Sequence, residues 1–187
     1  MKKRILAMAF AVAMAVGAAG CGGGAAQSGV DDAKAAEMQA ELQAYDVMLT
    51  PEDAVAAGMF TITGGAVVSG QENWDAFMAG EADSVLLCQF SAKGGAMLDY
   101  VAKQEDGSYL VVSDLTRDGY EYEGKEDYQT QVFTEIKVFE NFTVQEGGTP
   151  HTVCVMTNDA ALDAATFLQY WKDLSYEENG AFMLFVI

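Results

Sequence analysis

The feature that most constrains the fold is a series of three strand-like segments joined by very short links. Segments 84–91, 96–103 and 108–115 are rich in Val, Leu, Tyr and Phe, and the glycine-containing links 93–95 and 104–107 separate them. Links this short join only antiparallel neighbours, since a parallel connection needs roughly a dozen residues or more. The sequence therefore predicts an antiparallel meander.

Further strands are predicted on both sides of the meander. Each candidate is an apolar or alternating run that ends at glycine or at another turn-forming residue. The segments are 59–63, 66–69, 130–144, 152–156 and 181–187. The last is apolar to its final residue, which favours a strand buried in the sheet.

Helical patterns occupy the stretches between these strands. Segment 30–44 is rich in Ala, Glu, Gln and Met, but its apolar stripe is weak, so 31–44 is predicted to be a helical stalk. Thr50 and Pro51 are typical of a helix start, and Gly58 ends that helix.

Two more helices are predicted further along the chain. Segment 71–79 would place Trp74, Phe77 and Met78 on one face. Thr157 or Asn158 would cap a helix from 159 to about 174. Taken together, 45–187 is expected to be a single α+β domain with a largely antiparallel sheet packed against two or three helices.

The N-terminal segment indicates where the chain is sent. Three cations at 2–4 precede an apolar run at 5–16, which is too short for the ~30 Å hydrocarbon layer. The following Ala-Ala-Gly-Cys sequence resembles the bacterial lipobox, although Ala18 stands where the pattern more often has Leu. This resemblance implies a lipoprotein signal peptide at 1–20, an acylated Cys21 carrying palmitate-like chains, and a flexible tether at 21–30. The alternative is an ordinary secretory signal with an incidental Cys21.

The charge of the chain argues against nucleic acid as a partner. The formal net charge is −18, and removing 1–20 lowers the 10 Lys and Arg to 7 while all 28 acids remain, giving −21. Binding to phosphates depends on cationic side chains. We expect instead a partner protein or small ligand at the outer face of the cytoplasmic membrane, where the lipid anchor holds the domain.

A second resemblance extends from Thr50 to about Asp118. A helix ending in Gly58, Gly70 followed by Asn73, and a strand ending in Asp-x-x-x-Asp at 114–118 follow one another in order. This pattern resembles domain of unknown function 4362, a family of small secreted or lipid-anchored Gram-positive proteins. Met59 and the 93–96 turn depart from it. The resemblance implies fold and location only.

The sequence contains few candidates for catalysis. His151 is the only histidine, and no Gly-x-Ser-x-Gly motif supplies a nucleophile for it. A zinc site would have to combine His151, Cys88 or Cys154, and carboxylates, and these residues do not have the spacing of a zinc-binding motif. A hydrolase that uses a pair of carboxylates stays an alternative, but a binding domain without catalytic activity is the favoured hypothesis.

Cys88 and Cys154 lie 66 positions apart in two predicted strands. On the oxidising side of a membrane they could form one disulfide. Two separate buried thiols are the alternative.

The densest charge lies in the acidic loop 114–127. Its carboxylates could bind a hard cation such as Ca²⁺, with Asp114, Asp118, Glu121 and Glu123 as candidate ligands. The spacing differs from an EF-hand, so a solvated acidic loop is the favoured interpretation. Arg117 is the only arginine after residue 20, and we expect it to order the loop by pairing with Asp114 and Asp118.

Four large aromatic residues stand at helical spacings, and they could form either a core or a sugar-binding platform. They are Trp74, Phe77, Phe167 and Trp171. The core is the expected role.

Overall fold

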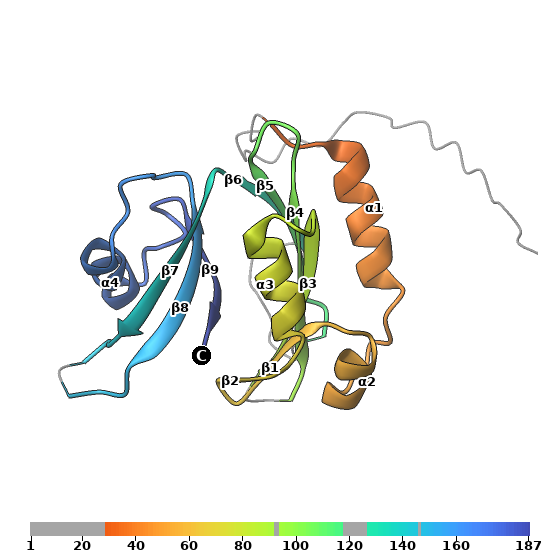
Figure 1. Ribbon diagram of the computed structural model, residues 1–187, viewed down its shortest axis with the longest axis horizontal. Helices are drawn as coiled ribbons and strands as arrows, with labels where there is room; N and C mark the ends of the chain where they lie inside the picture. The colour runs from red at the N-terminus through yellow and green to blue at the C-terminus, as the bar shows by residue number, and fades with distance from the viewer. Residues whose placement is uncertain (1–28, 92–93, 118–126, 146) are drawn as a thin grey trace, which may run out of the picture.

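A largely antiparallel sheet, a second and fully antiparallel sheet, and four helices make up the described part of the domain (Figure 1). The computed structural model describes residues 29–91, 94–117, 127–145 and 147–187. The helices are α1 (Asp32–Gln43), α2 (Pro51–Ala56), α3 (Gln71–Ala79) and α4 (Ala164–Asp173). The strands are β1 (Phe60–Thr63), β2 (Ala66–Ser69), β3 (Ser84–Phe90), β4 (Ala96–Lys103), β5 (Tyr109–Asp114), β6 (Tyr128–Phe133), β7 (Glu135–Phe142), β8 (His151–Thr157) and β9 (Ala181–Val186). The predicted α+β class is confirmed.

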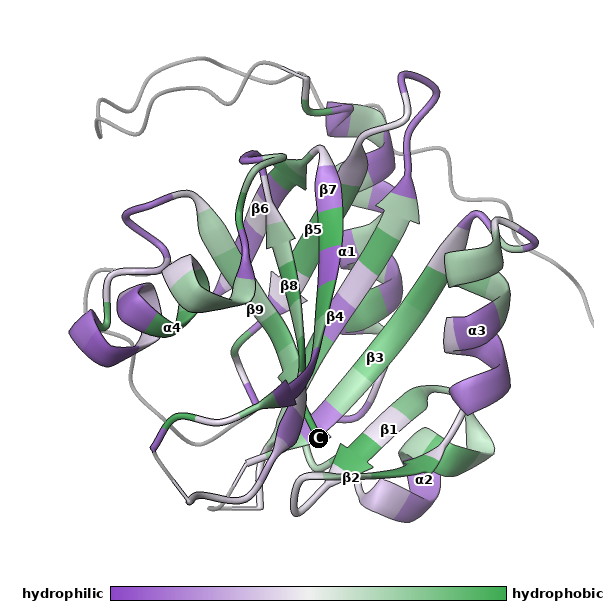
Figure 2. Cartoon of the chain, turned by 60° about the vertical axis from the view of Figure 1, so that its left-hand side comes forward, coloured by the Kyte–Doolittle hydropathy of each residue, from purple (hydrophilic) through white to green (hydrophobic). Residues whose placement is uncertain are grey.

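The larger sheet, sheet A, has the strand order β2-β1-β3-β4-β5-β6. Its centre is the predicted meander, because β3, β4 and β5 pair antiparallel in sequence order. Strand β1 runs parallel to β3, and the connection between them passes through β2 and α3. Figure 2 shows that β3 is hydrophobic along most of its length, as expected for a strand covered on both faces.

The smaller sheet, sheet B, has the order β7-β8-β9. The sequence predicts one strand over 130–144, and this is wrong, because the chain passes from sheet A to sheet B at Thr134. Asn158 stabilises the change of sheet: its side-chain oxygen accepts from Thr134 N at 3.0 Å, and its Nδ2 donates to Val132 O at 3.2 Å. The backbone groups freed at the break are thereby bonded.

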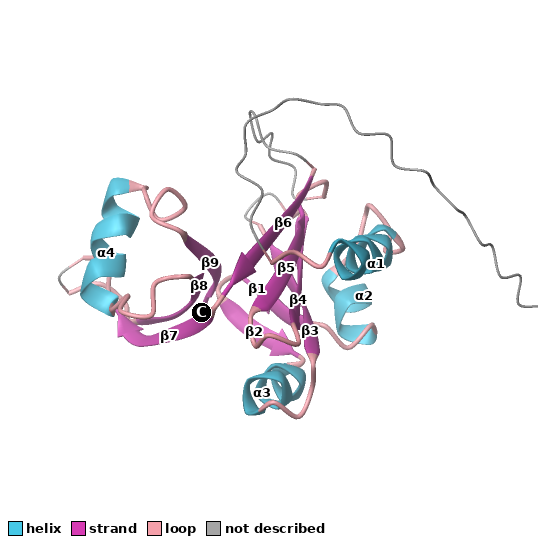
Figure 3. Cartoon of the chain, turned by 90° about the horizontal axis from the view of Figure 1, so that it is seen from above, coloured by secondary structure: helices cyan, strands magenta, loops and turns pink. Residues whose placement is uncertain are grey.

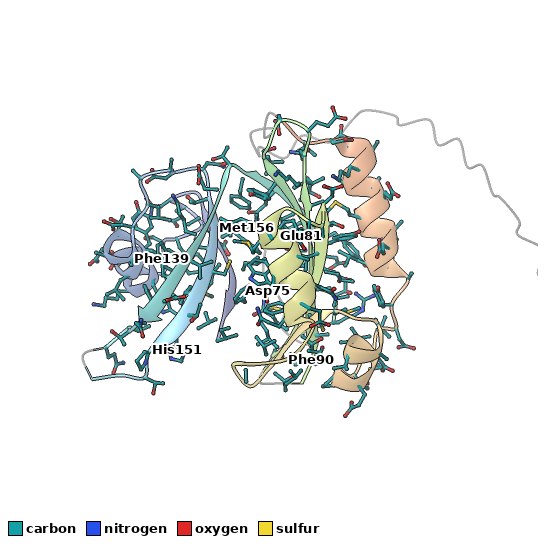
Figure 4. All side chains as sticks on the ribbon, in the orientation of Figure 1. Asp75, Glu81, Phe90, Phe139, His151 and Met156 are labelled. Carbon is teal, nitrogen blue, oxygen red and sulfur yellow. The ribbon has the colours of Figure 1, made fainter. Side chains whose placement is uncertain are left out.

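The helices and sheets form successive layers (Figure 3). Three apolar cores lie between these layers. Helices α1 and α2 cover one face of sheet A, and α3 and sheet B cover the other. Met156 of β8 lies in the core between the two sheets (Figure 4). Helix α4 packs on the outer face of sheet B through large rings, with Phe142 and Phe167 centroids 5.8 Å apart.

Helix α1 is part of the domain and not a stalk. Met38 and Leu42 are buried against β4 and β5, one helical turn apart. A stripe of two large side chains is narrow, which is why the sequence pattern is weak. Among the described residues no helix has the length and apolar character to cross a membrane.

The helix ends follow the sequence predictions in part. Thr50 and Asp53 form a capping box at α2. Helix α4 begins later than predicted, because Asp163, and not Thr157 or Asn158, accepts from the backbone of its first turn. In α3, Trp74 and Phe77 are buried, whereas Met78 is 44 % exposed and lies off that face.

Leu174 ends α4 in an unusual way. Its φ of 53° lies in the left-handed region, and its side chain is 81 % exposed. We expect Leu174→Gly to raise the free energy of unfolding by about 0.5–1 kcal/mol, because glycine adopts this conformation without steric cost. Chemical denaturation measures the change. Leu174→Ala is the control, since it removes the exposed side chain but keeps the strained backbone, and an equal gain there would contradict this explanation.

Candidate functional site

A groove runs along the beginning of β3, and we call it the β3 groove. It consists of three adjoining cavities of about 660, 160 and 230 Å³. The first two share Lys34 and Asp83, and the second and third share Ser84 and Tyr100. The walls therefore come from α1, α3, β4 and the β4–β5 turn. Asp83, just before β3, lines the first two cavities, and Ser84, the first residue of β3, lines the second and third.

A tyrosine hydroxyl lies at the middle of the β3 groove. The Tyr100 hydroxyl lies 3.5 Å from Ser84 Oγ, across the β3–β4 pair. Tyr45 does not line the groove; burial raises its pKa, and the nearby Glu41 carboxylate and Tyr100 raise it further. The groove thus offers the hydroxyl and the ring of Tyr100, a combination suited to hydrogen bonding and stacking.

The far end of the groove is rigid because Asn73 ties α3 to the turn after α2. Asn73 Nδ2 donates to Gly58 O at 2.6 Å. Gly58 has a φ of 74°, so this turn favours glycine. The Gly58 and Asn73 positions singled out in the sequence therefore meet at one wall.

Acidic side chains dominate the lining. They are Asp31, Glu37, Glu41, Asp83, Glu105 and Asp106, against Lys34 and Lys103. Lys34 Nζ is held by Lys103 O at 2.7 Å. Within the described residues no hydrogen-bond or ion-pair partner holds the carboxylates of Glu37, Asp83 and Glu105. These three carboxylates are available to a ligand.

Arg117 fastens the end of α1 to sheet A. Its Nη2 donates to Leu42 O at 3.1 Å and Tyr45 O at 2.9 Å, and its Nε donates to Asp46 O at 3.1 Å. Nη1 forms an ion pair with the fully buried Asp114. The expected Arg117–Asp114 pair is present, whereas Asp118 lies outside the described residues. The contacts to α1 were not predicted, because they join positions more than 70 residues apart.

The candidate cation ligands divide into two groups. Asp114 is already engaged, because its Oδ1 accepts from Thr116 N and Thr116 Oγ1 while its other oxygen pairs with Arg117. Asp118, Glu121 and Glu123 lie outside the described residues. In the part of the chain that the structure describes, no group of three or more His, Cys, Asp or Glu side chains could hold a metal ion.

The two candidate disulfide cysteines are free and buried. Cys88 packs in the core under α1, and Cys154 packs in the core between the sheets, so sheet A lies between them. The structure therefore has the alternative arrangement of two separate thiols. Burial raises the pKa of Cys88 to about 12 and that of Cys154 as well, which leaves both thiols unreactive near neutral pH. His151 is half-buried at the start of β8 and pairs across the sheet with Phe142.

One buried carboxyl, Asp99, faces the core between the two sheets. It is 5 % exposed and accepts from Ser113 Oγ at 2.6 Å. Burial raises its pKa to about 6, while hydrogen bonds from Ser113 and Gln89 act in the opposite direction. Gln89 also donates to Leu184 O of β9 at 2.6 Å, so this polar cluster joins the two sheets. Asp99 was not predicted as a site residue, although an acid inside the apolar segment 96–103 is a sequence signal for a buried carboxyl.

The raised pKa of Asp99 predicts a stability that falls as pH rises from about 4 to 6. The unfolded chain releases this proton near pH 4, whereas the folded chain keeps it until about pH 6. The contribution of this proton to the free energy of unfolding is therefore complete below pH 4 and lost above pH 6, a decrease of about 2–3 kcal/mol. Asp99→Asn lacks this titration. Its free energy of unfolding, measured by urea denaturation, should therefore rise by this amount relative to that of the wild type between pH 4 and pH 7.

Glu178→Gln is the control for the pH series, because Glu178 is exposed and its substitution removes one negative charge in the same way. A difference between wild type and Asp99→Asn that stays constant across this range would contradict the prediction.

Comparisons with protein-family models, curated proteins and solved structures found no match to this chain.

Proposed function

We propose that this chain is a lipid-anchored, extracytoplasmic domain that binds a partner protein or small ligand in the β3 groove. The observation that carries the proposal is the continuity of the groove, because Asp83 lines the first and second cavities and Ser84 lines the second and third. Rigid elements form its walls, and it combines the ring of Tyr100 with carboxylates that are free to bind.

The position of the tether supports an envelope location for this groove. The predicted tether ends just before α1, and Asp31 and Lys34 at the start of that helix line the largest of the three cavities of the groove. The predicted tether, 21–30, spans at most roughly 35 Å when extended. A lipid on Cys21 would therefore keep the groove close to the membrane surface.

Site-specific photo-crosslinking in membranes tests the binding site. A benzoylphenylalanine residue replaces Glu37 in the groove or, as the control, Glu178 in an exposed turn. We expect a defined adduct from position 37 only, or a bound small molecule in native mass spectrometry. Equal adducts from both positions, or no adduct and no bound molecule, would contradict the proposal.

Mass spectrometry of the mature N-terminus tests the anchor separately. We expect a diacylglyceryl group on Cys21, and Cys21→Ser should release the protein from the membrane fraction. An unmodified Cys21 in the mature chain would remove the anchor from the proposal but leave the groove in place.

A further inference from the structure

The first half of β3 has a strand on one side only. All seven residues of β3 pair with β4, from Ser84 opposite Ala102 to Phe90 opposite Ala96. The parallel pairing with β1 begins only at Leu87. Among the described residues, no strand pairs with Ser84–Leu86 on the β1 side. Sheet A therefore has a short open edge inside an otherwise paired strand.

Backbone groups of this edge point into the β3 groove. Asp83 O accepts from Lys103 N at 2.8 Å, so the backbone of Asp83 faces β4. Since the direction alternates along a strand, the N–H and C=O of Ser84 face the opposite way. Ser84 also lines the cavities of about 160 and 230 Å³. An unpaired edge of this kind is a template for an added strand.

The charge around the edge selects the kind of segment that can pair with it. Glu37, Glu41 and Asp83 line the cavity next to Ser84, and Lys34, the only cation among its described lining residues, is bonded to Lys103 O. A second copy of this chain is disfavoured as the occupant, because its own edge carries the same carboxylates. A cationic peptide meets complementary charge.

We propose that the β3 groove binds an extended, positively charged peptide segment of a partner protein, which adds to the open edge at Ser84–Leu86 as a short strand. This inference rests on the proposed binding function of the groove and specifies its ligand. Main-chain hydrogen bonds to Ser84 supply the pairing, and the carboxylates of α1 receive Lys or Arg side chains on one face of the segment.

Peptide titrations of the full chain in detergent micelles test the proposal by NMR. The probes are a Lys-Val-Lys-Val-Lys peptide, its Glu-Val-Glu-Val-Glu counterpart, and a Lys-Val-Lys-Val-Lys peptide with N-methylated backbone amides. We expect the first to bind with amide shifts at Ser84 and Leu86, and the other two to bind at least tenfold more weakly. Equal binding of the N-methylated peptide would rule out strand addition, and equal binding of the acidic peptide would rule out charge selection.

Two variants test the site within the protein. Ser84→Pro removes the N–H that faces away from β4, and Ser84→Ala is the control that keeps it. We expect at least a tenfold loss of affinity in Ser84→Pro only. If Ser84→Pro fails to fold, the N-methylated peptide still decides the question. Crosslinks from position 37 together with no binding of the basic peptide would overturn this inference and leave the proposed function standing.

Discussion

Arg117→Met is expected to lower the free energy of unfolding by about 3–5 kcal/mol. The substitution leaves Asp114 as a fully buried carboxylate without its ion-pair partner. It also removes the donors that bond to the carbonyl oxygens of Leu42, Tyr45 and Asp46 at the end of α1. Urea denaturation followed by circular dichroism measures the loss.

Two further variants show which part of the Arg117 interaction matters. Arg117→Lys keeps the charge but lacks the planar group that reaches several acceptors, so we expect an intermediate loss. The double variant Asp114→Asn with Arg117→Met removes both charges and should be more stable than Arg117→Met alone. If the double variant loses as much free energy of unfolding as Asp114→Asn and Arg117→Met lose together, Asp114 and Arg117 do not interact.

The second large effect is expected for Gly70→Ala, which should lower the free energy of unfolding by about 3–4 kcal/mol. Gly70 precedes α3 with a φ of 73°, a conformation that favours glycine. A Cβ at this position would overlap the Met59 carbonyl oxygen and lie 2.7 Å from Phe60 N. Backbone atoms cannot move aside as a flexible side chain does, so β1 or α3 must shift. Thermal and urea denaturation measure the loss.

Gly80→Ala is a matched control for Gly70→Ala. Gly80 stands at the other end of α3 with a φ of 74°, and a Cβ there meets nothing within 4 Å. We expect a loss of about 1 kcal/mol from the left-handed backbone alone. The difference between the two losses of free energy of unfolding measures the effect of the contact with Met59 and Phe60. Equal losses in the two variants would show that this contact has no effect.

The parts of the fold that local sequence determines were predicted correctly. The meander of β3, β4 and β5 follows from tight links that permit only antiparallel pairing. The start of α2 follows from a capping box within four residues. In both cases the interacting groups are close in the sequence.

The errors arise where distant residues decide the structure. The division of 130–144 depends on Asn158, more than twenty residues away. The packing of α1 depends on Arg117, and nothing in the composition of 31–44 indicates that partner. Local patterns carry no information about such contacts.

The candidate site was the least predictable part, because no single segment contains it. The β3 groove takes Lys34 from α1, Asn73 from α3 and Tyr100 from β4, and of these only Asn73 belongs to a pattern noted in the sequence. The open edge at Ser84 depends on where β1 begins to pair with β3. The candidate cation ligands came from the acidic loop 114–127 instead, since charge density is visible in a linear sequence and concavity is not.

The bonds of Arg117 have a mechanical consequence. Any pulling force on the N-terminal segment reaches the domain through α1, whose other end Arg117 holds. Arg117 also pairs with Asp114 at the end of β5, so the load passes into an inner strand of sheet A, next to the edge strand β6. In a single-molecule pulling experiment from the N-terminus, α1 should detach as the first event, at a force that depends on Arg117.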